Sequence, residues 1–144
     1  MYSKISQSLV GGIAATVVMT IVMMIAPMMG LAEMNPPAMV SGMMGMPIAV
    51  GWIMHFIIGI VFAASYVYFF RFKLPLGNTV LKGIVFGIII AVMAKIGMTI
   101  MGAMAGRGTP ELEGSMVSMI MALILGHVIF GIVVALVTKE PKIA

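Results

Sequence analysis

Four long apolar runs dominate this sequence, at residues 8–29, 48–70, 80–102 and 116–137. A helix rises about 1.5 Å per residue, so about 20 residues cross the ~30 Å hydrocarbon core of a bilayer. Backbone groups inside lipid must be hydrogen-bonded within the protein, and in a single segment only a helix achieves this. The runs therefore predict an all-α bundle of four transmembrane helices, and the connections are too short for a separate soluble domain.

Composition restricts the chemistry that such a bundle can carry. The chain is 62% apolar and 8% charged, whereas a soluble domain is roughly 25% charged. Cysteine is absent, which excludes disulfides, thiolate metal sites and iron–sulfur ligation. Aspartate is absent too and every glutamate lies outside the runs, so no carboxylate pair is available for acid–base catalysis within the membrane. We expect no catalytic activity from the chain alone, and its scattered basic residues do not predict nucleic-acid binding.

The sequence also repeats itself. The phrase "HFIIGIVFA" begins at His55, and "HVIFGIVVA" begins 72 positions later at His127. The same offset relates further pairs, namely Gly11 with Gly83, Gly59 with Gly131 and Ala63 with Ala135. Residues 1–72 and 73–144 are therefore interpreted as two parallel two-helix repeats. Each repeat crosses the membrane twice and inserts the same way up, which predicts a pseudo-two-fold axis along the membrane normal.

The two histidines are the candidate ligands of a shared site. A single histidine in a span often only joins helices by hydrogen bonds, and that alternative stays open here. Two equivalent histidines among spans nearly free of ionisable groups instead favour a functional site. A b-type haem needs a histidine on each face, apolar walls and small residues beside its edge. The glycines that offer this clearance are Gly51, Gly59, Gly126 and Gly131.

This pattern of paired histidines resembles the membrane four-helix b-type cytochromes. The resemblance implies that His55 and His127 both ligate a haem b, and that the chain serves electron transfer or anchoring in a larger membrane complex. Lys95 lies in the middle of the third run, where a lysine costs about 2.5–3.5 kcal/mol on insertion scales. We expect its ammonium group to meet a haem propionate or a carboxylate of another subunit. Extension of the side chain to the membrane surface, toward Glu111 or Glu113, is the alternative.

Methionine supports a second hypothesis. Apart from the first residue, every methionine lies at positions 19–54 or 93–121. These positions belong to the side of the membrane that the distribution of basic residues predicts to be outside. Thioethers suit Cu(I), so Cu(I) handling is an alternative function. Its candidate ligands are Met28, Met29, Met43, Met44, Met46, Met101 and Met116. Methionine also fills irregular gaps in cores, so a cofactor-free accessory subunit of a membrane complex remains a third possibility.

The chain as a whole resembles an uncharacterised group of small four-span prokaryotic membrane proteins. The residues that carry this resemblance are "GGIAATVVMT", which opens the first run, and the Gly-His phrases of the later runs. The resemblance implies a location in the prokaryotic cytoplasmic membrane and brings no function with it. The expected partners are the lipid bilayer and either other membrane subunits or further copies of the chain.

Basic residues predict how the chain is oriented. Six of the eight lie on one side of the predicted spans, at Lys4, Arg71, Lys73, Lys82, Lys139 and Lys142. The positive-inside rule then places both termini in the cytoplasm, with the connections at 30–47 and 103–115 outside. Reporter fusions at Asn78 and Thr109 should therefore report opposite compartments. A shared compartment for the two fusions contradicts the four-span topology.

Overall fold

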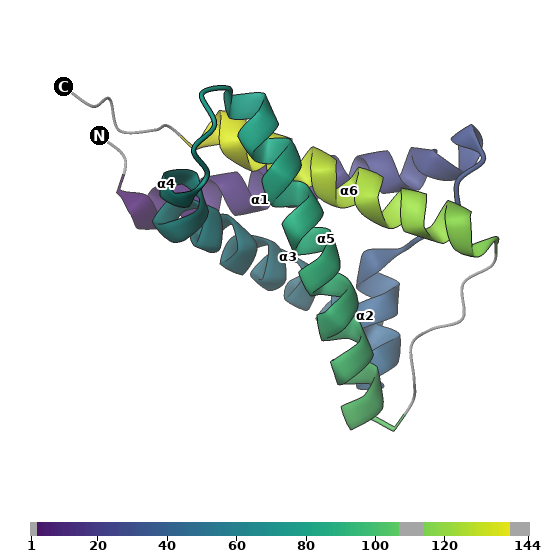
Figure 1. The fold of residues 1–144 in the computed structure, drawn as a ribbon. Coiled ribbons are helices and arrows are strands. Elements are labelled where there is room, and N and C mark those ends of the chain that lie inside the picture. The colour runs from purple at the N-terminus through teal and green to yellow at the C-terminus, as the bar shows by residue number, and fades with distance from the viewer. Residues whose placement is uncertain (1–2, 107–113, 139–144) are drawn as a thin grey trace.

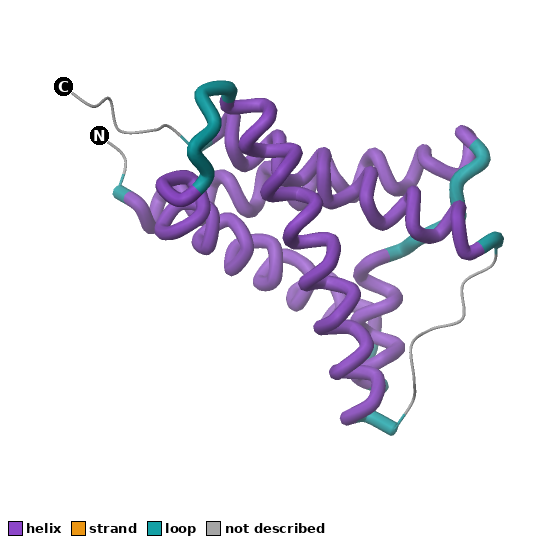
Figure 2. The backbone as a smooth tube through the Cα atoms, viewed as in Figure 1, coloured by secondary structure: helices purple, strands orange, loops and turns teal. Residues whose placement is uncertain are grey.

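The computed structural model describes residues 3–106 and 114–138, which form helices and connecting loops with no strand (Figure 2). The helical elements in chain order are α1 (Lys4–Ile25), η1 (Ala26–Met29), α2 (Pro36–Met44), α3 (Ile48–Ser65), η2 (Tyr66–Phe70), α4 (Arg71–Lys73), α5 (Thr79–Met104) and α6 (Met116–Val137). Of these, η1 is a 3₁₀ turn and η2 a π-helical turn. The all-α fold predicted from the apolar runs is confirmed.

Four continuous helical segments are long and apolar enough to span a membrane. They comprise Lys4–Met29, Ile48–Lys73, Thr79–Met104 and Met116–Val137. Each contains a predicted run, and the first three extend a few residues beyond it. The extension at the start of α1 and α5 follows from polar N-caps, because the side chains of Ser3 and Asn78 accept hydrogen bonds from the first free backbone N–H groups. A search for apolar runs does not include these first turns, because they contain polar residues.

The helix α2 lies in the connection at residues 30–47, for which the sequence predicts a loop. Asn35 caps its start by accepting a hydrogen bond from the Ala38 N–H at 3.1 Å, and Pro36 occupies the first turn. Gly45 ends it in the left-handed conformation, with φ of 64°. At nine residues this helix is too short to span a bilayer, so a search for long apolar runs misses it.

The two hairpins pack through the same kind of contact. Within each hairpin the helices run antiparallel, α1 beside α3 and α5 beside α6 (Figure 1). A Cβ added to Gly12 would lie 2.6 Å from the Ile60 Cα, and one added to Gly83 would lie 2.6 Å from the Ile132 Cα. Ile60 and Ile132 occupy the same position in the two repeats. In both halves a glycine of the first helix therefore allows direct backbone contact with the second.

The main interface between the two halves is that of α1 with α6. Helix α1 packs along α6, whereas the pair related to them by the repeat, α3 and α5, has no comparable interface among the described residues. Instead α2 packs on α3 and also contacts α5. Figure 1 shows α5 diverging from α1 and α6 toward the end of the bundle that carries α2. This α2 end is where the bundle has room for an internal site.

The opposite end of the bundle is closed by polar and aromatic contacts. The buried Arg71 side chain donates to the Gln7 side-chain oxygen at 3.0 Å, and Lys82 Nζ lies 3.4 Å from the Arg71 carbonyl. The buried Tyr66 ring packs on Phe86 at a centroid distance of 5.0 Å. These contacts join α1, η2, α4 and α5 at the end of the bundle opposite α2.

Substitution of Gly83 by alanine tests the close contact between α5 and α6. The added methyl group meets backbone atoms of Ile132 and Gly131 at 2.6–2.9 Å, and overpacking of this kind costs about 1–3 kcal/mol. Gly97 is the matched control in the same helix, because a Cβ there has no heavy atom within 4 Å. Unfolding in detergent should show a loss of stability for Gly83→Ala and none for Gly97→Ala. Equal stability of the two variants would contradict the packing.

Candidate functional site

A cavity of about 340 Å³ lies at the α2 end of the bundle. Its lining comes from α1, α2, α3, α5, α6 and the loop before α2. The polar side chains among the lining residues are those of Thr16, His55 and His127. Seven methionines contribute to the apolar remainder, namely Met19, Met23, Met34, Met39, Met93, Met98 and Met101. A small-molecule site typically has about 300–1,000 Å³ and this mixture of apolar walls with a few polar groups.

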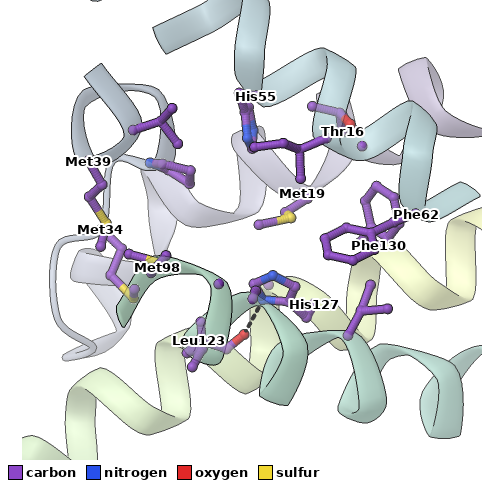
Figure 3. Close-up of a pocket in the computed structure, with 18 of the residues that line it drawn as sticks. Thr16, Met19, Met34, Met39, His55, Phe62, Met98, Leu123, His127 and Phe130 are labelled. Carbon is purple, nitrogen blue, oxygen red and sulfur yellow. Dashed lines mark hydrogen bonds between the residues drawn. The ribbon is translucent and has the colours of Figure 1, made fainter. Parts of the chain in front are cut away.

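The structure brings the two histidines to this one cavity. His55 projects from α3 and His127 from α6, and the Met19 side chain of α1 lies between them (Figure 3). The aromatic rings of Phe62 and Phe130 form part of the same lining. Side chains that are 72 positions apart in the sequence therefore face a shared apolar space.

The ring of His127 has a defined tautomer. Its Nδ1 lies 2.8 Å from the Leu123 carbonyl oxygen (Figure 3), and a carbonyl only accepts hydrogen bonds, so Nδ1 carries the proton. In the neutral imidazole Nε2 then holds the lone pair. Metal-ligating histidines are commonly oriented by such a hydrogen bond from the other ring nitrogen. His127 is therefore the side chain best prepared to bind a metal centre in the cavity.

The ring of His55 is held differently. Its Nε2 lies 3.1 Å from Thr20 Oγ1, and the Thr20 hydroxyl donates to the Thr16 carbonyl at 2.7 Å. A hydroxyl has one hydrogen, so Thr20 accepts from His55 and Nε2 is the protonated nitrogen. The lone pair of His55 is then on Nδ1. The two histidines present opposite tautomers although their positions in the repeats are equivalent.

Thr16 brings an additional polar group to the cavity. Its side chain is 1% exposed and its Oγ1 has no hydrogen-bond partner among the described residues. The hydroxyl fits against Gly59, because a Cβ at that glycine would collide with it. An unsatisfied buried hydroxyl costs about 1–3 kcal/mol. The oxygen has almost no accessible surface and lies against Gly59, so the hydroxyl belongs to the contact between α1 and α3.

Two thioethers lie close to His127. An added Cβ at Gly126 would be 2.8 Å from Met23 Sδ and 3.6 Å from Met19 Cε. Both methionines are buried, at 3% and 7% exposure for Met23 and Met19. Gly126 therefore allows the α1 methionines to approach α6 directly beside the histidine.

The other haem-associated residues predicted from the sequence occupy different places. Gly59 and Gly126 line the cavity, but Gly51 and Gly131 do not. Gly51 lies against the Pro37 carbonyl, and Gly131 lies against Gly83, so the small size of both serves helix packing. Lys95 is exposed on α5 and is not part of the lining.

The methionines predicted for copper are dispersed. Met101 alone among them lines the cavity. Four are exposed, at Met28, Met29, Met46 and Met116, while Met43 is buried and Met44 half-buried in α2. Glu111 and Glu113, the proposed surface partners of Lys95, lie outside the described residues.

Sequence reasoning missed Thr16, Met19 and Met23 as site residues. A weak signal was available, because Thr16 and Thr20 are polar where the second repeat has Ile88 and Val92. Such a break in a repeat marks a position where the two halves have different neighbours. The identity of those neighbours follows only from the packing of α1 against α3 and α6.

The chain belongs to DUF6789, a family of unknown function whose sequence profile matches residues 2–142. This agrees with the expected likeness to an uncharacterised group, and the family description adds no activity. Neither a curated protein nor a solved structure matches the chain. The functional assignment therefore depends on the geometry of the cavity.

Nitrogen NMR of protein labelled with ¹⁵N-histidine tests the two hydrogen bonds. We expect one ring protonated at Nδ1 and the other at Nε2, because their partners are the Leu123 carbonyl and the Thr20 hydroxyl. Thr20→Val should perturb only the Nε2-protonated ring. Thr99→Val is the control, since Thr99 makes the same bond to a carbonyl four residues earlier on an exposed face. Two rings with the same tautomer would contradict the described site.

Proposed function

We propose that this member of DUF6789 is a membrane subunit that binds haem b in the cavity between His55 and His127. The observation that carries the proposal is the orientation of His127, whose Nδ1 is bonded to the Leu123 carbonyl while Nε2 keeps a lone pair. This imidazole lines an apolar cavity of about 340 Å³ inside the membrane-spanning bundle. An axial histidine within apolar walls is the environment in which proteins hold haem.

The size of the cavity favours an organic cofactor over a bare metal ion. Metal–nitrogen and metal–sulfur bonds are about 2.0–2.3 Å long, so an ion draws its ligands together and leaves little space. A cavity of about 340 Å³ instead suits a molecule with a substantial apolar surface. Phe62, Phe130 and the lining methionines offer contacts to such a surface, and methionine adapts its shape to irregular partners.

Each residue has a distinct part in this proposal. His127 would hold the iron through Nε2, and Gly126 allows the Met19 and Met23 side chains of α1 to lie close to α6 beside it. The apolar side chains of α1, α3 and α5 that line the cavity would exclude water from a bound haem. When bound, the haem supplies one-electron redox chemistry. We infer a role in electron transfer or anchoring within a larger membrane complex, because the described connections are too short to form a separate catalytic domain.

Cu(I) binding is the second candidate function. It is favoured by the approach of Met23 Sδ and the Met19 methyl group to Gly126, next to His127. Two thioethers and an imidazole are ligands that Cu(I) accepts. This candidate differs from the sequence-based hypothesis, which assigned the metal to methionines that are mostly exposed.

We further propose that the chain lies in a prokaryotic cytoplasmic membrane with both termini in the cytoplasm. Lys4, Arg71, Lys73 and Lys82 lie at the end of the bundle opposite α2, which supports this orientation through the positive-inside rule. The α2 end would then face the outside. Other membrane subunits are the expected partners in this setting.

Titration of the purified protein with ferric haem tests the proposal. The wild-type protein should bind one haem per chain with a Soret band that His127→Ala weakens. Loss of a direct ligand should reduce haem affinity at least on the order of 100-fold, since even outer-shell groups contribute 10–100-fold at metal sites. Ile124→Ala is the control, because Ile124 lies on the exposed face of α6.

The same preparations distinguish the alternatives. Retention of Cu(I) without a Soret band, and its loss in Met19→Leu with Met23→Leu, would replace haem by copper. A wild-type protein that binds neither would leave a cofactor-free accessory subunit. Equal haem binding by wild type and His127→Ala would reject the assigned ligand.

A further inference from the structure

We propose that a transmembrane helix of another membrane protein packs along α5 and places a carboxylate beside the Lys95 ammonium group. The contact lies outside the cavity, so it does not depend on which ligand the cavity takes. It defines the partner by its chemistry, as a membrane helix with an acidic residue at the depth of Lys95. Two independent observations support it, one from the repeat and one from the charge.

The first observation is a difference in packing between two equivalent helices. Helices α1 and α5 occupy the same position in the two repeats. Helix α1 packs along two long helices, α3 and α6. Helix α5 packs along α6 and, among the described residues, has only a smaller contact with the short helix α2. One side of α5 is therefore not covered by a long helix, and Figure 1 shows α5 diverging from the rest of the bundle.

The exposure of equivalent residues locates that side. Thr20 and Met23 of α1 are 9% and 3% exposed. Their counterparts 72 positions later are Val92, which is 58% exposed, and Lys95, which is also exposed. Met23 is covered by α6, because its Sδ would lie 2.8 Å from a Cβ added at Gly126. The repeat therefore indicates that the side of α5 around Lys95 is a position for a further helix.

The second observation is the charge on this side. None of the four spans contains an acidic residue, so no span of the bundle neutralises Lys95. An ionisable side chain within a membrane span is costly when it faces lipid, and such residues usually pair with another polar group. A carboxylate supplied from outside the chain would offset this cost.

Extension of Lys95 to the nearer membrane surface is opposed by the direction of its side chain. Lys95 precedes the last residue of α5, Met104, by nine positions, which is about 14 Å along the helix axis. The Cα–Cβ bonds of a helix tilt toward its N-terminus, and the N-terminus of α5 is the end farther from Lys95. The side chain therefore leaves the backbone away from the nearer surface. A partner group at the depth of Lys95 meets the ammonium group without reversing that direction.

The charge also identifies the partner as a different protein. All four glutamates of the chain lie outside its spans, so a second copy has no carboxylate to offer within a span. A symmetric pair of α5 helices would instead bring two Lys95 ammonium groups together, and like charges repel. Lipid phosphates lie at the membrane surface, beyond the hydrocarbon core. An acidic residue in a span of another protein satisfies all three conditions.

Fluorescence energy transfer in lipid vesicles tests the proposal with a defined probe. The chain has no cysteine, so Gly77→Cys in the full-length protein provides a single site for a donor dye. A Cβ at this exposed glycine has no heavy atom within 4 Å. The probe is a leucine-rich transmembrane peptide that carries an acceptor dye and a glutamate at the depth of Lys95, and the control peptide has leucine there. The glutamate peptide should bind on the order of tenfold more tightly, as expected of a polar contact between membrane helices.

Substitutions of Lys95 show whether the preference depends on its charge. Lys95→Met introduces the residue that the first repeat has at the matching position, Met23, and should abolish the preference for the glutamate peptide. Lys95→Arg should keep it. Lys73→Met is the matched control, because Lys73 is an exposed lysine at the opposite end of the bundle, and it should also keep the preference. Circular dichroism confirms that each variant is folded.

Equal binding of the two peptides by the wild-type protein, or a preference that survives in Lys95→Met, would overturn the proposal. A variant with Glu111→Gln and Glu113→Gln should show the same preference as the wild type. A preference that appears only in this variant would assign Lys95 to a pair within its own chain. Energy transfer between two labelled copies that is lost in Lys95→Met would assign this side of α5 to a second copy. No measurement in this series requires haem, so its outcome is separate from that of the haem titration.

Discussion

Direct backbone contact at glycine is the constraint on which this structure depends. In lipid, helices gain little from burying apolar side chains, so association depends on close packing. Gly12 against Ile60 and Gly83 against Ile132 bring the helices of each hairpin together. The two hairpins then join through α1 and α6, while α3 and α5 remain apart. The cavity exists because one of the two possible interfaces between the halves is replaced by the short helix α2.

The two histidines occupy matching positions at the 72-residue offset, but their hydrogen-bond partners differ. His127 uses its own helix, through the Leu123 carbonyl, to fix its ring. His55 uses the neighbouring helix, through Thr20. The second repeat has Val92 where the first has Thr20, so His127 has no hydroxyl partner that corresponds to Thr20. Two copies of one hairpin can thus form a site with unlike sides, which an asymmetric ligand requires.

The architecture was predictable because spanning a membrane demands length and apolarity, and both are visible in the sequence. The four spans confirm that reasoning. By contrast α2 was not predicted, because its signals are local: Asn35 and Pro36 at its start and Gly45 at its end. The pairing of the histidines could be proposed from the 72-residue offset, but their hydrogen-bond partners could not. Thr16 is informative only because Gly59 of another helix lies against it, a contact between residues 43 positions apart.

Pulsed electron paramagnetic resonance of ferric-haem protein labelled with ¹⁵N-histidine tests the assignment of His127 most directly, because it detects nitrogens bonded to the iron. The assignment predicts a ¹⁵N hyperfine coupling in the wild-type protein that persists in His55→Ala and disappears in His127→Ala. A coupling that survives in His127→Ala, or a wild-type spectrum without any histidine coupling, would contradict it.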